Sequence, residues 1–289
     1  MDNYNGIFVI DKPAGMTSHD VVARVRRILG QRKVGHGGTL DPMATGVLPV
    51  FAGRSTRAAD FVQSGGKTYV AGMRLGITTD TQDTTGTVLI QRPVTCSRGH
   101  VEAILEGFRG DILQIPPMYS ALHVNGQRLY KLARAGVEVE REARSVRIDD
   151  LRFTAQIAPN EYELEVSCSK GLYVRTLVAD VGEALGCGAA MSSLRRTRAG
   201  IFAIEDAVTV EELQIFADKE ALGDKIICTD VLFSYLPALE LDTSDAGALK
   251  NGRTVRYLPF GKFRLYCDGV FLGPGRSSEG MLRLEKSFY

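Results

Sequence analysis

The sequence predicts an α+β fold, and three observations lead to this prediction. Charged and apolar residues alternate over residues 161–166, as in a half-exposed antiparallel strand. Apolar residues recur at helical spacing over residues 18–29, and a second helix is predicted over 173–185, ending near Gly186. Strands and helices follow one another without a regular strand–helix–strand rhythm, which favours α+β over parallel α/β.

The first predicted elements are a strand and a helix. Residues 7–10 predict a short buried strand that ends in the turn Asp11-Lys-Pro-Ala-Gly. The valines, isoleucine and leucine of residues 18–29 share one helical face, and the arginines of this segment fall largely outside it. Thr17 and Ser18 are both candidate N-caps, and Asp20 in the first turn suits the positive end of the helix dipole.

The remaining elements follow in chain order. Residues 47–51 predict a buried strand and residues 67–75 a further strand. Thr209 followed by Glu212 is a capping-box pattern, which predicts a peripheral helix within 201–235. The short apolar runs after Leu236-Pro237 are separated by glycines and predict antiparallel strands. We therefore expect a large domain over 1–235 and a small β-rich domain over 236–289, which suits a length of 289 residues.

The near-neutral charge total hides local differences. The chain has 35 basic and 34 acidic residues, a net charge of +1, which argues against a simple basic nucleic-acid-binding domain. Residues 201–235, however, hold 2 basic and 8 acidic residues, whereas 1–200 hold 25 and 20 and 236–289 hold 8 and 6. Two mildly basic blocks therefore flank an acidic one, and a nucleic-acid partner remains compatible with the composition.

Composition and spacing also exclude several classes of protein. An apolar fraction of 44% and a charged fraction of 24% exclude a disordered or collagen-like chain. Five scattered cysteines predict reduced thiols in the cytosol, and neither they nor the four histidines show metal-ligand spacing. No signal peptide or long apolar run occurs, so we expect a cytoplasmic protein without membrane contact. The segment Gly273-Pro-Gly-Arg-Ser-Ser-Glu-Gly resembles a dinucleotide loop only superficially, so no cofactor is expected.

Residues 33–46 form the segment richest in unusual residues. Four glycines and a proline predict an irregular loop, and it carries one acid, Asp41, and one imidazole, His36. Asp41 precedes Pro42, which biases its backbone away from the helical region. A carboxylate on such a loop is a candidate nucleophile or general base. The alternative is a surface turn in which Asp-Pro only supplies turn geometry.

Three further segments carry candidate functional side chains, each with a structural alternative. Arg175 follows Tyr173 at a predicted helix start, where it would orient a buried carboxylate or lie exposed. Tyr69 would stack on a base or transfer a proton, or else pack in the core. The arginines of Ser192-Ser-Leu-Arg-Arg-Thr-Arg, Arg196 among them, would contact phosphate or form a solvated charge run.

Taken together, these segments resemble the bacterial tRNA pseudouridine-55 synthases, the TruB family, over nearly the whole chain. The resemblance depends on motifs that occur in the family's order: Asp11-Lys-Pro-Ala-Gly-Met-Thr-Ser-His-Asp, Lys33-Val-Gly-His-Gly-Gly-Thr-Leu-Asp-Pro-Met-Ala-Thr-Gly-Val-Leu, Gly66-Lys-Thr-Tyr, Asp80-Thr-Gln-Asp, Gln114-Ile-Pro-Pro-Met-Tyr-Ser-Ala and Cys168-Ser-Lys-Gly-Leu-Tyr-Val-Arg-Thr.

The resemblance implies a pseudouridine synthase fold, with a central mixed, mainly antiparallel sheet and a C-terminal PUA-like RNA-binding domain. It implies conversion of uridine 55 in the tRNA T loop to pseudouridine, without cofactor or metal. The implied partner is tRNA, bound by its T arm and at the acceptor end, and nothing in the sequence demands more than a monomer. An inactive tRNA-binding or RNA-chaperone protein on the same scaffold is the alternative.

The resemblance also assigns roles to individual residues. Asp41 matches the catalytic aspartate, although the sequence leaves open whether it attacks C1′ or takes the 2′ proton. The other matches are binding roles: Arg175 pairs with the aspartate, Tyr69 stacks on the uracil and is a candidate final base, Tyr173 and Leu194 line the uracil pocket, His36 helps to open the T loop, and Lys12 with Pro13 supports the site. One departure is Gly37, where relatives usually carry Thr, and we expect it to loosen the loop around His36.

Overall fold

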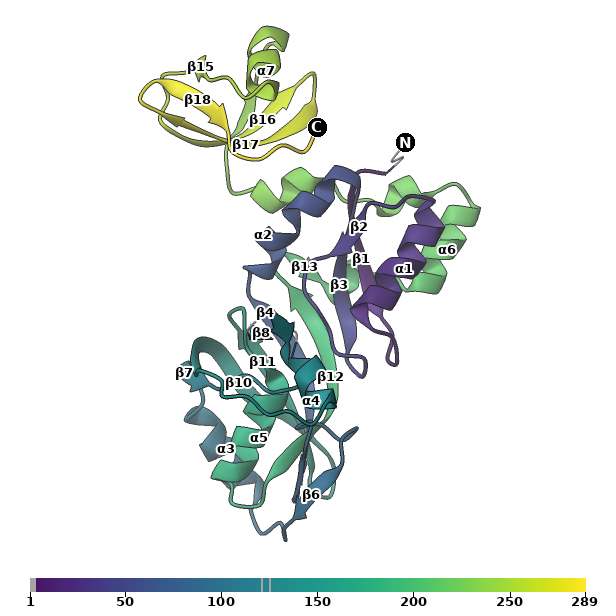
Figure 1. Cartoon of the computed structure of the whole chain (residues 1–289), viewed down its shortest axis with the longest axis vertical. Helices are drawn as coiled ribbons and strands as arrows, with labels where there is room; N and C mark the ends of the chain where they lie inside the picture. The colour runs from purple at the N-terminus through teal and green to yellow at the C-terminus, as the bar shows by residue number, and fades with distance from the viewer. Residues whose placement is uncertain (1–3, 121, 125) are drawn as a thin grey trace.

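The computed structural model describes residues 4–120, 122–124 and 126–289. Within these residues the chain builds one large mixed sheet, a smaller C-terminal sheet and two short hairpins. Figure 1 shows the C-terminal sheet at one end of the molecule, and α3 and α5 at the other. The helices are α1 Ser18–Leu29, α2 Ala59–Gln63, α3 Arg98–Glu106, α4 Leu129–Arg134, α5 Val174–Ala184, α6 Val210–Asp218 and α7 Thr243–Lys250.

The large sheet has the strand order β1-β3-β12-β4-β11-β10-β7, with β2 paired to β3 and β13 to β12. Its pairs are antiparallel except for β3 and β12, which run parallel, so the predicted mixed and mainly antiparallel sheet is confirmed. Its strands are β1 Gly6–Lys12, β2 Val34–His36, β3 Thr45–Ala52, β4 Lys67–Leu75, β7 Gly110–Gln114, β10 Arg144–Ala158, β11 Glu161–Cys168, β12 Ala189–Ala199 and β13 Phe202–Ala203.

The second sheet has the order β14-β16-β17-β18-β15. Its strands are β14 Ala238–Glu240, β15 Val255–Arg256, β16 Gly261–Cys267, β17 Val270–Ser278 and β18 Met281–Leu284. The segment from Gly273 that resembles a dinucleotide loop lies mostly in β17 and pairs with β16 and β18. The two hairpins are β5 Ile77–Thr79 with β6 Val88–Gln91, and β8 His123–Val124 with β9 Gln127–Arg128.

Local signals explain where the first helix begins and ends. The Thr17 hydroxyl accepts from the amide of Asp20, and the Asp20 carboxylate accepts from the amide of Thr17, so Thr17 is the N-cap. Because this capping box satisfies otherwise unpaired amides, the chain enters the helix at Ser18. Gly30 ends it in the left-handed conformation, with φ of 61°. The valine face of α1 packs with α6 against β1 and β3. Figure 1 shows the two helices next to each other, beside these strands.

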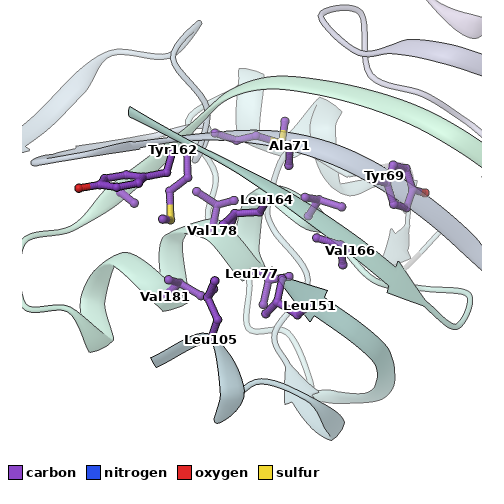
Figure 2. Close-up of a cluster of buried hydrophobic side chains, with 14 of the residues drawn as sticks. Tyr69, Ala71, Leu105, Leu151, Tyr162, Leu164, Val166, Leu177, Val178 and Val181 are labelled. Atoms are coloured by element: carbon purple, nitrogen blue, oxygen red, sulfur yellow. The ribbon is translucent and has the colours of Figure 1, made fainter. Parts of the chain in front are cut away.

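Helices α3 and α5 cover the other half of the sheet. Their apolar side chains meet those of β4, β10, β11 and β12 in one buried cluster. Figure 2 shows this cluster, with Tyr162 at one end and Tyr69 at the other. Burial of side chains such as Leu164 and Leu177 stabilises the fold by about 1.5–3 kcal/mol each. Tyr69 therefore lies where the core of the sheet ends, next to the cavity described below.

The two sheets are joined by aromatic rings. Phe233, in the 3-10 helix Thr229–Phe233, is fully buried beside Phe271 of β17 and Phe288 near the C-terminus. The rings of Phe271 and Phe288 stack at 5.8 Å, and Phe233 lies 5.8 Å and 5.9 Å from them. The same apolar cluster includes Val47 and Phe51 of β3, so these rings connect the two parts, although the C-terminal sheet also has a separate apolar cluster around Leu265 and Leu282.

Candidate active site

Asp41 lies in the loop between β2 and β3, at the wall of a cavity of about 1520 Å³. Its side chain is 37% exposed, and its Oδ2 atom is 2.9 Å from Nε of Arg175. The amide of Ala44 donates to the Asp41 carbonyl, which closes a tight turn around Pro42. A carboxylate that is half-open to a cavity and paired on one side with a guanidinium is oriented for chemistry at a bound ligand. The surface-turn alternative for Asp41 does not describe this geometry.

Arg175 is the second residue of α5, and its side chain is only 6% exposed. Its Nη1 donates to the carbonyl of Thr81 at 2.9 Å, and its Nη2 to the carbonyl of Tyr119 at 2.8 Å. The exposed-helix alternative for this arginine is therefore wrong. Because both terminal nitrogens of the guanidinium donate to carbonyls, its Nε–H points at Asp41 in a fixed direction.

Asp83 is a second carboxylate near Arg175, buried where Asp41 is half-open, and the sequence did not single it out as a functional side chain. Its Oδ2 lies 3.8 Å from Nη1 of Arg175. Its Oδ1 accepts from the hydroxyls of Thr81 at 2.8 Å and Thr85 at 2.5 Å, and from the Thr85 amide at 3.0 Å. The available signal was the motif Asp80-Thr-Gln-Asp, in which the last residue carries these bonds. Asp83 therefore orders the segment whose Thr81 carbonyl holds Arg175.

The cavity brings together five of the seven sequence-predicted site residues: Asp41, Tyr69, Tyr173, Arg175 and Leu194. Besides Arg175 and Arg196, five cationic side chains line it, against the three carboxylates of Asp41, Asp60 and Asp83, so the lining has an excess of positive charge. The five cations are Lys67, Arg128, Arg134, Arg144 and Lys170. A cavity with an apolar and aromatic interior and a basic rim suits a flat base attached to a phosphate backbone.

The two cavity tyrosines are held differently. Tyr69 of β4 is 7% exposed and stands opposite Arg196 across the β4–β12 pair. The main-chain amide of Tyr173 donates to Oε1 of Gln114 at 2.8 Å, and Nε2 of Gln114 donates back to the Tyr173 carbonyl at 3.1 Å. Burial raises the pKa of both phenols, so both are protonated at neutral pH.

Lys12 and His36 lie behind the cavity wall. His36 packs edge-on against His19, which lines the cavity, with ring centroids 5.2 Å apart. Burial and the neighbouring His19 lower the pKa of His36 to about 4, so its ring is neutral at pH 7. Lys12 is fully buried, and its Nζ donates to the carbonyls of Pro13 at 2.8 Å, Met16 at 2.5 Å and Pro42 at 3.2 Å. Lys12 therefore holds the residue that follows Asp41.

Burial also lowers the pKa of Lys12, to about 8, which predicts a pH dependence of stability. The unfolded chain keeps the proton up to about pH 10.4, whereas the folded protein releases it near pH 8. Because the unfolded state binds more protons in this interval, raising the pH from 8 to 10 should stabilise the wild type relative to Lys12→Met. Urea unfolding of both proteins across this range measures the difference. Parallel curves would contradict a buried, titrating Lys12.

Arg196 is buried, whereas the sequence predicted an accessible side chain. It is 1% exposed, and its guanidinium donates to the carbonyls of Val47, Thr39 and Gly38. The solvated-charge interpretation of this arginine was therefore wrong. Arg196 lines the cavity with its guanidinium bonded to main-chain carbonyls, and the phosphate contact stays a prediction. A buried arginine on β12 can satisfy several main-chain carbonyls at once.

Gly37 is buried, and its amide donates to the carbonyl of Pro49 at 2.8 Å. A Cβ atom at this position would lie 2.8 Å from Cε2 of Phe51, so the Phe51 ring fills the space that a larger side chain would need. Glycine therefore packs closely here, and the loosening around His36 stays a prediction.

Within the described ranges, no three His, Cys, Asp or Glu side chains lie close enough together to hold a metal ion. None of the helices there has the length and apolar composition needed to cross a membrane.

Family models match almost the entire chain. The model described as TruB family pseudouridylate synthase (N terminal domain) matches residues 26–174. The tRNA pseudouridylate synthase B C-terminal domain matches residues 175–234, and the model for the C-terminal part of pseudouridine synthase II TruB matches residues 237–284.

Individual proteins match over similar lengths. The tRNA pseudouridine synthase B of Azoarcus sp. (strain BH72) is 45% identical over 282 residues, which cover 96% of this chain and 93% of the relative. Its counterpart from Pseudomonas aeruginosa (strain UCBPP-PA14) is 48% identical, over 95% of this chain and 92% of the relative. A solved chain of a Cbf5-Nop10-Gar1 complex superposes with a TM-score of 0.73 and 26% identity, covering 98% of this chain and 85% of that one.

Proposed function

Because the chain belongs to the TruB family of pseudouridylate synthases, it isomerises uridine in tRNA to pseudouridine, and we propose that Asp41 is its catalytic residue and uridine 55 its target. The observation that carries the assignment of Asp41 is its ion pair with the buried Arg175 at the wall of the cavity. The reaction breaks the C1′–N1 bond, turns the uracil and joins C5 to C1′. The Asp41 carboxylate would act on the ribose, either at C1′ or on the 2′ proton.

The uracil would be bound among Tyr69, Tyr173 and Leu194. A base inside a folded loop must first be flipped out, which costs a few kcal/mol. Aromatic and apolar contact in a closed pocket offsets this cost. Because burial raises the pKa of Tyr69, its phenol is protonated in the free protein. We therefore propose that Tyr69 stacks on the uracil. It would remove the C5 proton only at a later step, once the bound ribose and uracil have changed the environment of its phenol.

The basic rim of the cavity would hold the T arm through its phosphates. Residues 1–235 would form the catalytic domain, and 236–289 a PUA-like domain that contacts the acceptor end. The break between the large sheet and β14 at Ala238 supports this division. We further propose that the protein works as a monomer in the cytoplasm.

Incubation of the protein with an unmodified tRNA transcript tests this function. We expect one pseudouridine, at position 55, and none in a transcript with cytidine at that position. Chemical mapping of pseudouridine along the RNA locates the product. Tight binding of both transcripts without any product would favour an inactive RNA-binding protein instead.

A further inference from the structure

The loop that carries Asp41 is held by side chains from outside the loop, and two of these have no role in the proposed chemistry. Arg175 and Lys12 hold the loop at Asp41 itself and at the Pro42 carbonyl. The main chain just before Asp41 is bound by two other side chains. These are Ser18 of α1 and Arg196 of β12, and each is 1% exposed.

Arg196 connects the two ends of the loop. Its Nε donates to the carbonyl of Val47 at 2.8 Å, in the strand that follows the loop. Its Nη2 and Nη1 donate to the carbonyls of Gly38 at 3.2 Å and Thr39 at 3.4 Å, in the part that precedes Asp41. A guanidinium offers several N–H groups in a fixed plane, so one side chain fixes both ends relative to each other.

The main chain of Arg196 also lies close to the start of β3, directly after the loop. A Cβ atom on Gly46 would lie 2.2 Å from the Arg196 carbonyl oxygen, so the two strands meet at a distance that only glycine permits. Gly46 has φ of 98°, a conformation that other residues rarely adopt. This close approach fixes β12 beside β3 at the residue whose guanidinium bonds the loop.

Ser18 holds the residue next to Asp41. Its Oγ accepts from the amide of Leu40 at 2.8 Å and donates to the carbonyl of the same residue at 3.1 Å. Ser18 is the first residue of α1, whose start is set by the Thr17 cap. The helix therefore delivers a buried hydroxyl that satisfies both polar groups of Leu40, which would otherwise be buried without partners.

We infer that Arg196 and Ser18 are positioning residues, which hold the main chain before Asp41 so that the carboxylate meets Arg175 and the ribose in one geometry. This inference rests on the proposed role of Asp41. Both side chains border the cavity, but each is 1% exposed and its polar atoms are bonded to the main chain, so we expect their loss to act on turnover and to leave binding nearly unchanged. A displacement of about 1 Å in a catalytic group costs up to roughly 100-fold in rate.

The test measures kcat and KM for tRNA in Ser18→Ala and Arg196→Lys. We expect kcat to fall about 10-fold in the first and up to about 100-fold in the second, while KM stays within about threefold. Hydrogen exchange should be faster for the amides of residues 37–44 in both variants. This second readout needs no substrate, so it also stands if the wild type makes no pseudouridine and the proposed function itself fails.

Ser55→Ala is the matched control. Ser55 is a fully buried serine with two side-chain hydrogen bonds, to Asn5 at 3.2 Å and Thr229 at 2.5 Å, and it does not line the cavity. Its loss should lower stability as Ser18→Ala does, without changing kcat or exchange in residues 37–44.

Three results would overturn the inference. An unchanged kcat in folded Ser18→Ala is the first. The second is an equal loss of kcat in Ser55→Ala, because stability alone would then explain the effect. The third is a rise in KM at constant kcat in Arg196→Lys, which would mark an RNA contact. Should Arg196→Lys fail to fold, Ser18→Ala and the exchange data decide the question.

Discussion

Asp41→Asn is expected to lower pseudouridine formation by roughly 10³-fold or more, with tRNA binding within about threefold of the wild type. The amide keeps the size of the carboxylate but has neither its charge nor its basicity, so it can neither attack C1′ nor take a proton. Because the reaction removes the hydrogen at C5, release of tritium from C5-labelled tRNA measures turnover directly. A filter-binding titration with the same RNA measures affinity.

Asp60→Asn provides the matched control, since Asp60 lines the same cavity but lies on its exposed edge. It should turn over tRNA at nearly the wild-type rate. Turnover by Asp41→Asn at more than about a tenth of the wild-type rate would remove Asp41 from the catalytic role.

Arg175→Met is expected to have the second largest effect, on both rate and stability. The change removes the partner of Asp41 and leaves the buried Asp83 without its nearest cation. It also leaves the carbonyls of Thr81 and Tyr119 without this donor. Removing one member of a buried ion pair costs about 3–5 kcal/mol, and we expect kcat to fall at least about 100-fold as the carboxylate loses its orientation.

Arg195→Met separates this effect from the loss of an ordinary ion pair. Arg195 pairs with Asp11 at 2.7 Å, but its side chain is 42% exposed. An exposed pair contributes about 1 kcal/mol or less, so urea unfolding should distinguish the two variants clearly. Equal unfolding free energies would contradict the view that the Arg175 cluster is a buried network.

The elements of this fold were predictable where local sequence decides them. The range 18–29 coincides with α1 and 67–75 with β4, because capping residues and the spacing of apolar side chains act over a few positions. Thr209 and Glu212 likewise form the capping box that starts α6. Strand β17 was less visible in the sequence, because the glycines and proline of residues 273–275 are uncommon inside strands.

The surroundings of the charged side chains could not be predicted in this way. Arg175 and Arg196 stand in sequence contexts that also suit exposed arginines, and their burial depends on carbonyls from segments 56 to 158 residues away. The burial of Asp83 has the same origin, because it faces Arg175 only after α5 packs on the sheet. Such contacts arise from tertiary packing, which no local pattern encodes. The resemblance to a family indicated the role of Arg175, whereas the carbonyl partners of Arg196 are visible only in the folded structure.

The packed rings of Phe233, Phe271 and Phe288 have a consequence for how the molecule unfolds on heating. Two units with separate cores would melt in separate steps. Here the ring of the next-to-last residue lies in the same apolar cluster as Val47 and Phe51 of the strand that follows the Asp41 loop. The C-terminal sheet also has an apolar cluster of its own, around Leu265 and Leu282. Opening the C-terminal end nevertheless exposes part of the core beneath that strand, so we expect loss of this end to lower the melting temperature of the large sheet.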